Sequence, residues 1–414
     1  MKIILKDCKE ILTLKNAHQK DGRFLKPKDK SIEKNKSILC ENGKIITIDT
    51  FSSIEKNNPD ATIIDCSQFC ITPELVDSHT HLVFGGNRAF EYSMRLDGAT
   101  YEDIAKSGGG ILHTMKQTNA SSKDELFNLA CERIEKIHSL GVGTIEIKSG
   151  YGLNLEKEIE LSEIIHELKL KYKGTVQIFN TFMAAHAVPK EYVSSSDYME
   201  NVVLPALESL GLRKIIDSVD IFLEDGYFSE KDVIVLNQKA KGFGIPLKIH
   251  ADEFINLEGA SLACELNALS ADHLLAISDK GIESFSKSKT VATLLPGTGY
   301  FLGKEQCDAR ALLDAGAKVS IASDYNPGSC HQFDLKKIAC LSAPNYKMNS
   351  TETWSSITLN ASSSLGLNNQ GTICSNMQSR FSFWECNSLD EVLYNWDENY
   401  SVWPEQYLNY LSTL

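Results

Sequence analysis

The sequence predicts an α/β fold, in which a (β/α)8 TIM barrel carries a small β-sandwich domain formed from the N- and C-terminal segments. From residue 75 onward, short apolar runs rich in β-branched residues alternate with helical patterns. Parallel strands need crossover connections, and eight such units over about 290 residues have the size of a barrel. An open doubly wound sheet is the alternative, but neither GxGxxG nor GxxxxGK[ST] occurs in the chain.

The two ends of the chain do not follow this alternation. Residues 1–70 contain short strand-and-turn patterns such as KIITIDT, and the segment 365–414 contains another, GTICSNMQSRFSFWEC. We expect these segments to form the composite small domain and residues 71–364 to form the barrel. The basic stretch at 20–36 also holds acidic and turn-forming residues, which predicts a solvated hairpin loop.

Within the barrel segment, strands and helices are expected in strict order. The helical patterns between strands include LEKEIELSEIIHELKLKY, YMENVVLPALESLG, SEKDVIVLNQKAKGFG and LEGASLACELNA, several of them followed by glycine. The expected strands are LVDSHTHLVF, GTIEIKSG, TVQIFNTFMAAH, SVDIFLEDG, PLKIHADE, ALSADHLLAI, TVATLLPG and KVSIASDYNPG.

Charge and cysteine content restrict the class of protein. The formal net charge of -13 disfavours binding to nucleic acid or to an anionic membrane, so an anionic small-molecule substrate would need a local cation. No run approaches the ~18 apolar residues of a membrane span, and charges interrupt the apolar residues near the N-terminus. The 11 cysteines form no CxxC pair, so we expect a cytoplasmic protein with reduced thiols.

Polar residues gather where the expected strands end, which is where barrel enzymes place their chemistry. Residues two apart on a strand point to the same side, so the imidazoles of an HxH pair can reach one ion, although such a pair can also be satisfied in a core. Three imidazoles and one carboxylate from different strands suit one metal ion per chain, Zn²⁺ or Fe²⁺/Fe³⁺, with a position left open for water. The proposed ligands are His79, His81, His250 and Asp324.

Three further strand-end residues have open or competing roles. Glu253 follows His250 in HADE, where it could act as a general acid/base or simply cap the next helix. His273 could lie near a developing oxyanion or be a core histidine. Glu224 could bond backbone or neighbouring groups, and its role is left open.

Loops behind the strands suggest substrate contacts. Arg88 in GGNR could bind a carboxylate in bidentate fashion, although a surface ion pair is the usual fate of an arginine. Tyr151 lies between glycines in KSGYGL, and the tight loop DYNPGS carries Asn326, Gly328 and Ser329. The stretch SGGGILHT predicts a flexible lid or tight turn rather than a phosphate cradle, and its His113 has no assigned partner.

Taken together, these motifs resemble the amidohydrolase superfamily. HTHLVFGGNRAFEYSMRL, SGGGI, EIKSGYGL, AAHAVP, KIHADE, LSADHL, LLPG and NPGS resemble, in this order, the imidazolonepropionase family over most of residues 71–365. The resemblance implies hydrolysis of 4-imidazolone-5-propanoate to N-formimidoyl-L-glutamate, a step of histidine degradation. Binuclear relatives need a carboxylated lysine on strand four, where this chain has Glu224. The chain departs from the usual Ala-Asp pattern at Ser379 and Arg380.

The resemblance also implies roles for single residues. Glu253 would shuttle the proton of a metal-activated water, Asp324 would orient that water, and His273 would stabilise the oxyanion. One metal would be held by the four proposed ligands. The implied substrate contacts are Arg88, Tyr151, His186, Asn326, Gly328 and Ser329.

Two other functions are compatible with parts of the sequence. A ring deaminase acting on a nucleobase would share the metal ligands, but Arg88 favours a substrate with a carboxylate. A non-catalytic ligand-binding barrel would not be expected to keep the complete metal and acid/base set. The expected partner is a small molecule, without nucleic acid or membrane. A homodimer fits the family, although the residues identify no interface.

Overall fold

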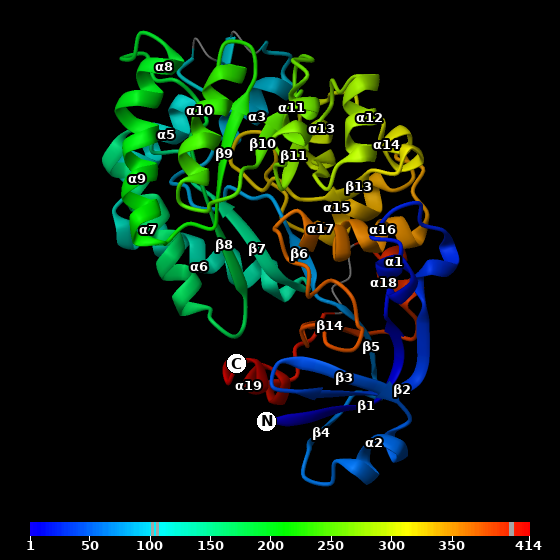
Figure 1. Cartoon of the computed structure of the whole chain (residues 1–414). Coiled ribbons are helices and arrows are strands. Elements are labelled where there is room, and N and C mark those ends of the chain that lie inside the picture. Colours follow the sequence, from blue (N-terminus) through cyan, green and yellow to red (C-terminus); the bar gives the residue numbers. More distant parts are fainter. Residues whose placement is uncertain (101–102, 105–106, 397–400) are drawn as a thin grey trace.

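The computed structural model describes residues 1–100, 103–104, 107–396 and 401–414. Eight parallel strands follow one another in chain order within one sheet, which confirms the predicted barrel (Figure 1). They are β6 (Leu75–Asp77), β7 (Val142–Lys148), β8 (Gln177–Ala185), β9 (Ser218–Leu223), β10 (Ile249–Ala251), β11 (Ser270–His273), β12 (Val291–Leu294) and β13 (Lys318–Ile321).

The barrel is closed by backbone contacts beyond the ends of its first and last strands. β6 ends at Asp77, earlier than its apolar run predicts. The chain then continues to His81, whose backbone N–H donates to the Tyr325 carbonyl at 2.9 Å, while Asp324 N–H donates to the His79 carbonyl, also at 2.9 Å. These two bonds place the first and the last proposed metal ligands side by side.

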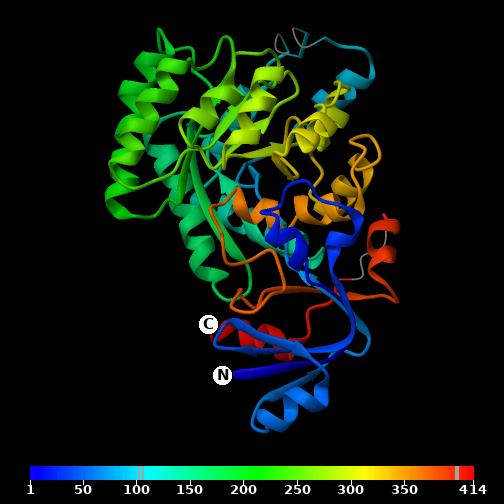
Figure 2. The same cartoon turned by 45° about the vertical axis from the view of Figure 1, so that its right-hand side comes forward.

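Helices cover the outside of the barrel (Figure 2). Apolar residues at helical spacing explain why: in α7, Leu161, Ile164, Ile165 and Leu168 form one fully buried stripe. The helices that follow the parallel strands include α7 (Leu155–Lys171), α9 (Leu204–Arg213), α10 (Glu230–Lys241), α11 (Gly259–Glu265), α12 (Asp279–Lys287) and α14 (Ala309–Ala315), and α6 (Lys123–Ser139) precedes β7.

The remaining helices are mostly short. The predicted helix at 198–211 is divided between α8, a five-residue π-helical segment η2 and α9. None of the described helices is long and apolar enough to cross a membrane. The shorter segments are α1 (Lys15–Gln19), η1 (Pro27–Lys30), α2 (Phe51–Asn57), α3 (Ala89–Leu96), α5 (Ile111–Ala120), α8 (Ser195–Tyr198), η2 (Met199–Val203), α13 (Pro296–Leu302), α15 (Leu335–Ser342), α16 (Ser350–Ser356), α17 (Leu359–Ser363), α18 (Leu389–Tyr394) and α19 (Glu405–Ser412).

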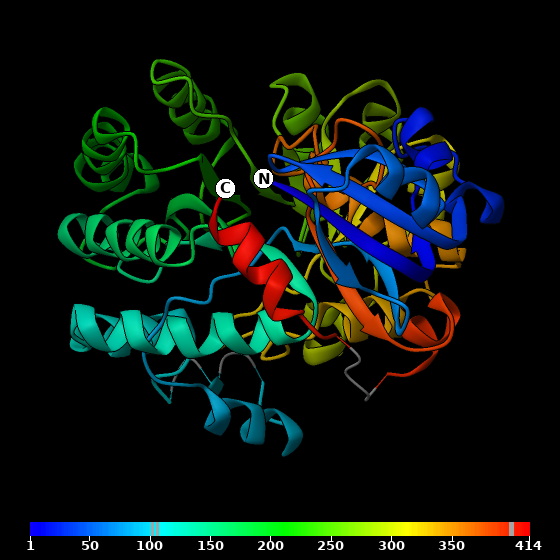
Figure 3. The same cartoon turned by 90° about the horizontal axis from the view of Figure 1, so that it is seen from below.

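The two ends of the chain meet in a second sheet below the barrel. Its strand order is β14-β5-β1-β2-β3, with β4 on β1, and β14 pairs with β5 in antiparallel register. Figure 3 shows α19 lying beside this sheet, and Tyr407 and Tyr410 pack into its core. The strands are β1 (Lys2–Leu12), β2 (Ile32–Glu41), β3 (Lys44–Asp49), β4 (Thr62–Asp65), β5 (Phe69–Pro73) and β14 (Phe381–Glu385).

Two segments tie this sheet to the lower end of the barrel. Arg380, one of the unusual residues before β14, donates through Nε to Glu74 at 2.6 Å and through Nη2 to the Gly143 carbonyl at 2.9 Å. The stretch 20–36 leads from β1 into antiparallel β2, as expected of a hairpin, but it is not simply a solvated loop, because it contains η1 and its residues 32–36 belong to β2. Arg23 donates to the backbone carbonyls of Ser288 and Gly316 and is 15% exposed, because the loop docks against the turns before β12 and β13.

Candidate metal and hydrolytic site

Three imidazoles converge inside the upper end of the barrel. His79 and His81 lie in the extended segment after β6, and His250 lies in β10. One ring nitrogen of each lies within 4.8 Å of the others, and the ring centroids of His79 and His250 are 4.5 Å apart. Burial lowers the pKa of His79 and His81 well below the usual value, which leaves neutral rings that can donate lone pairs.

Carboxylates from other strands of the barrel hold two of these rings, Asp272 from β11 and Asp220 from β9. His79 Nδ1 lies 2.6 Å from Asp272 Oδ2, and His250 Nδ1 lies 3.1 Å from Asp220 Oδ1. Both Nε2 atoms are buried and have no hydrogen-bond partner among the described residues. A carboxylate on one ring nitrogen is the usual arrangement of a metal-ligating histidine, with the other nitrogen left for the ion.

Asp324 completes the arrangement beside these rings. Its Oδ1 lies 3.5 Å from His79 Nε2 and 3.9 Å from His81 Nε2, while its Oδ2 accepts a hydrogen bond from Thr298 Oγ1 at 2.5 Å. Burial raises the pKa of its carboxyl to about 6. Because the buried Nε2 atoms of His79 and His250 lack hydrogen-bond partners among the described residues, and a carboxylate oxygen lies 3.5 Å from the first of them, the residues present fit a metal ion.

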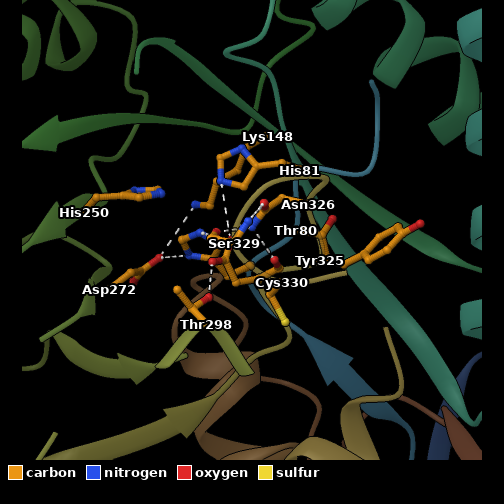
Figure 4. A network of polar contacts seen from close by, with 12 residues as sticks. Thr80, His81, Lys148, His250, Asp272, Thr298, Tyr325, Asn326, Ser329 and Cys330 are labelled. Atoms are coloured by element: carbon orange, nitrogen blue, oxygen red, sulfur yellow. Dashed lines mark hydrogen bonds and ion pairs between the residues drawn. The ribbon is translucent and has the colours of Figure 1, made fainter. Parts of the chain in front are cut away.

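A layer of buried charges adjoins the histidines, and Figure 4 shows two of its members, Lys148 and Asp272, near His81 and His250. Lys148 Nζ is 2.6 Å from Asp220 and 3.0 Å from Glu146, and Lys248 Nζ is 2.6 Å from Glu146. Both ammonium groups also lie within 4 Å of Asp272, at 3.7 and 3.8 Å, and all five side chains are 0% exposed. The lysines therefore supply positive charge to the carboxylates that orient the imidazoles.

Sequence reasoning missed this charged layer, although a signal was present. Glu146 and Lys148 are two residues apart in GTIEIK, and Lys248 and His250 are two apart in PLKIH. That spacing directs both members of each pair to the same side of a strand. His79, Glu146 and Asp272 also offer ligand atoms within 4.8 Å of one another, but the two ammonium groups already lie between these carboxylates.

Glu253 and His273 lie next to the imidazoles. The Glu253 side chain is 9% exposed, and its Oε2 is 3.5 Å from His273 Nε2. Burial raises the pKa of the Glu253 carboxyl well above its usual value, and the nearby Asp324 and Glu224 raise it further. The competing interpretation of Glu253 as a helix cap is wrong, because Asp252 accepts the N–H groups at the start of α11.

Glu224, whose role the sequence left open, fixes the loop that carries Glu253. Its Oε2 accepts the Phe254 N–H at 2.8 Å, and its Oε1 accepts the Asp225 N–H at 3.0 Å. Phe254 directly follows Glu253 in the chain. Glu224 is therefore a structural support for the loop in this arrangement.

One pocket brings most of the predicted residues together. Its walls include His81, His250, Glu253, His273 and Asp324, together with all the predicted substrate contacts, which are Arg88, Tyr151, His186, Asn326, Gly328 and Ser329. His79 lies behind this wall and is 0% exposed. Residues that line the pocket but were not predicted include Arg95, Gly110, Ile111, Phe222, Tyr227 and Phe254.

Several of the predicted substrate contacts also form hydrogen bonds or ring contacts with other residues of the protein. Arg88 donates from Nε and Nη2 to Glu91, at 2.9 and 2.6 Å. His186 stacks on His81 with ring centroids 5.0 Å apart, and burial lowers its pKa to about 3. Tyr151 is buried, with its ring centroid 5.4 Å from that of His186.

Asn326 organises the loop after β13. Its Oδ1 accepts the N–H groups of Gly328 and Ser329 at 2.8 Å each, and its Nδ2 donates to the Asp324 carbonyl at 2.7 Å. The side chain therefore fixes the backbone next to Asp324. His113, which had no partner assigned from the sequence, packs against Phe90 with ring centroids 5.3 Å apart and is not among the residues lining the pocket.

Solved structures share this fold at low sequence identity. Atrazine chlorohydrolase TrzN from Arthrobacter aurescens TC1, complexed with zinc, superposes with a TM-score of 0.72 at 13% identity over 96% of this chain and 92% of that one. Guanine deaminase from C. acetobutylicum, with bound guanine, gives 0.70 at 16% identity over 97% and 98%. These likenesses concern the fold alone.

Sequence relatives are closer. The Amidohydrolase family model matches residues 170–410. The imidazolonepropionase of Bacillus velezensis is 38% identical over 96% of this chain and 94% of its own length, and that of Bacillus cytotoxicus is 36% identical over 99% and 96%. The imidazolonepropionase of Agrobacterium fabrum is 40% identical over 87% and 86%. This relationship excludes the non-catalytic barrel, and the chain belongs to the imidazolonepropionase family of hydrolytic enzymes within the amidohydrolases.

Proposed function

We propose that this enzyme hydrolyses 4-imidazolone-5-propanoate to N-formimidoyl-L-glutamate. The observation that carries the proposal is the presence of Arg88 in the same pocket as the imidazoles and Glu253. The pocket thus combines groups suited to opening a cyclic amide with a cation suited to a carboxylate. In a chain of net charge -13, such a local cation offsets the repulsion of an anionic substrate.

His79, His81, His250 and Asp324 would hold one metal ion, and Zn²⁺ and iron both suit this donor set. When bound, such an ion acts as a Lewis acid that activates water and polarises a carbonyl oxygen. Asp220 and Asp272 would keep the imidazoles of His250 and His79 in the orientation that directs Nε2 toward the ion.

Glu253 would move the proton that the reaction requires. The oxygen of water forms a bond to the ring carbonyl carbon, the bond from that carbon to the ring nitrogen breaks, and the carboxylic acid that results releases its proton to solvent to become a carboxylate. Glu253 accepts the proton released by the water and delivers it to the departing nitrogen. Its raised pKa suits this role because the carboxyl can hold the proton between the two transfers. His273, 3.5 Å from Glu253, would stabilise the oxyanion, and Asp324 would orient the water.

The substrate would lie between the imidazoles and the loop after β13. Arg88 would bind the propanoate, while Tyr151 and His186 would pack against the ring. Asn326 would hold Gly328 and Ser329 in place to complete the contacts on the opposite side. Burial of the ring between aromatic side chains would exclude bulk water from the breaking bond.

The direct test is turnover of freshly prepared 4-imidazolone-5-propanoate, followed by the loss of its ultraviolet absorbance and by identification of N-formimidoyl-L-glutamate. We expect turnover that a chelator abolishes and that Zn²⁺ or Fe²⁺ restores. Nucleobases serve as the comparison substrates, because a ring deaminase would act on them. Release of ammonia from a nucleobase without opening of the imidazolone ring would refute the proposal.

We also propose that the domains of the chain divide near residues 70 and 365. The enzyme would act in the cytoplasm, without nucleic-acid or membrane partners. It would form a homodimer. The dimer is supported only by what is expected of the family. Light scattering after size-exclusion chromatography measures the mass in solution. A mass near the 46.0 kDa of one chain would contradict the dimer.

A further inference from the structure

Glu91 is a buried carboxylate at the rim of the pocket that the proposed chemistry does not use. It lies in the first turn of α3 and is 2% exposed. Burial of a carboxylate is costly unless hydrogen bonds compensate it. From the residues that the structure describes, Glu91 accepts three: from Arg88 Nε at 2.9 Å, from Arg88 Nη2 at 2.6 Å and from the Gly110 N–H at 3.0 Å.

These bonds determine which part of the Arg88 guanidinium faces the pocket. A guanidinium is planar and carries five N–H donors in a fixed geometry. Glu91 occupies the edge formed by Nε and Nη2. The Nη1 side faces the loop after β13, since a Cβ atom built on Gly328 would collide with Nη1. Because Glu91 binds the opposite edge, the Nη1 side of Arg88 points toward the pocket residues Gly328 and Ser329.

The glycine-rich stretch SGGGILHT is explained by the same contact. A Cβ atom on Gly109 would lie 2.9 Å from the Glu91 carboxylate, so a larger residue there would displace it. Gly110 has a φ of +84°, a conformation that favours glycine, and in it donates its N–H to Glu91. Gly110 and Ile111 then line the pocket beside Arg88. Residues 107–110 thus form a tight turn that packs against Glu91, and Ile111–Thr114 begin α5.

We propose that Glu91 is a positioning residue for substrate specificity: together with the Gly109–Gly110 turn, it presents the Nη1 side of Arg88 to the carboxylate of the substrate. The inference rests on the proposed function, since Arg88 must be the carboxylate anchor. Glu91 acts only through Arg88 and touches neither the imidazoles nor Glu253. Loss of the Glu91 side chain changes the orientation of Arg88 rather than the chemistry of ring opening.

The test is a double-mutant cycle with Glu91→Ala and Arg88→Ala, measured as KM and kcat on 4-imidazolone-5-propanoate with the metal-loaded enzyme. We expect E91A to raise KM about 10-fold, since it frees a charged hydrogen-bonded group, with kcat within about 3-fold. In the R88A background, E91A should change KM no further. E91Q keeps the shape of the side chain and an acceptor for Gly110, so it should fold and show a smaller rise in KM.

The matched control is Glu352→Ala. Glu352 is also buried and also binds an arginine through both oxygens, Arg310 at 3.1 Å for each, but it lies outside the pocket. We expect E352A to lower the melting temperature without changing KM. An E91A effect of equal size with and without Arg88 would overturn the inference, as would a loss of kcat at unchanged KM. If R88A itself leaves KM unchanged, the proposed function fails; if R88A raises KM but E91A and E91Q do not, only the role of Glu91 fails.

Discussion

The interior of the barrel and its rim hold their functional side chains in different ways. In the interior, His79 and His250 are fixed by Asp272 and Asp220, and Lys148 in turn contacts both carboxylates. All of these contacts come from strands or from the segment that closes the barrel. At the rim, Arg88 is held by Glu91, three residues away, and Glu91 in turn accepts the Gly110 N–H. The strands and the barrel-closing segment thus hold the imidazoles in place, and the loops hold the residue proposed to select the substrate.

The two regions should therefore respond differently to substitution. A change in the interior removes a partner from charges that have no access to water, so it should alter metal affinity, stability or kcat. A change at the rim leaves the imidazoles and Glu253 in place, so it should alter KM. An interior substitution that changed only KM, or a rim substitution that changed only kcat, would contradict this division of roles.

The largest effect is expected from Glu253→Gln, which removes the proton carrier at nearly unchanged shape. We expect kcat to fall about 10²- to 10⁴-fold, the usual contribution of a general acid/base. Metal content, measured by atomic absorption, should stay normal. If the variant keeps both its metal and near-normal turnover, Glu253 is not the proton carrier.

Lys148→Met should have the next largest effect, on the free energy of unfolding. It leaves Glu146 and Asp220 without the ammonium group that lies 3.0 and 2.6 Å from them. Breaking a buried ion pair on one side costs about 3–5 kcal/mol. Denaturant unfolding measures the loss, and Lys287→Met is the control, because the exposed pair of Lys287 with Glu283 should contribute less than about 1 kcal/mol. Equal losses in the two variants would show that the charged layer adds no stability.

Asp272→Asn should weaken metal binding more than it weakens the fold. Asn keeps the shape of the partner of His79 Nδ1 but removes its charge, and such changes lower metal affinity about 10- to 100-fold. Competition with a chelator measures the affinity. Asp232→Asn, in the capping box of α10, is the control for loss of a buried carboxylate away from the site. An unchanged affinity in Asp272→Asn would separate Asp272 from the metal site.

The sequence was sufficient for the strands, their order and the residues at their ends, since each depends on local pattern and on the geometry common to parallel barrels. It was not sufficient for contacts between distant segments. The early end of β6 at Asp77 follows from backbone bonds between His79–His81 and Asp324–Tyr325, more than 240 residues along the chain. The docking of Arg23 under the barrel depends equally on tertiary contacts.

The charged residues inside the strands, unlike these distant contacts, could have been predicted, because their spacing is visible in the sequence. Asp220 and Asp272 lie within runs that are buried and mostly apolar, so a pattern defined by the strand ends does not include them. The pair of Arg88 with Glu91 was also accessible, as an i,i+3 pair at the start of a helix. What no local pattern contains is that Glu91 also accepts the Gly110 N–H.

The most direct test of Arg88 as the carboxylate anchor compares kcat/KM for 4-imidazolone-5-propanoate with that for its uncharged propanamide analogue, in the wild type and in Arg88→Ala. We expect the wild type to prefer the carboxylate about 10- to 100-fold, the range for hydrogen bonds to charged groups. In R88A the preference should fall close to one, with kcat largely unchanged. A preference that survives in R88A, or a wild type that treats both compounds alike, would contradict the assignment of Arg88 as the residue that selects the substrate.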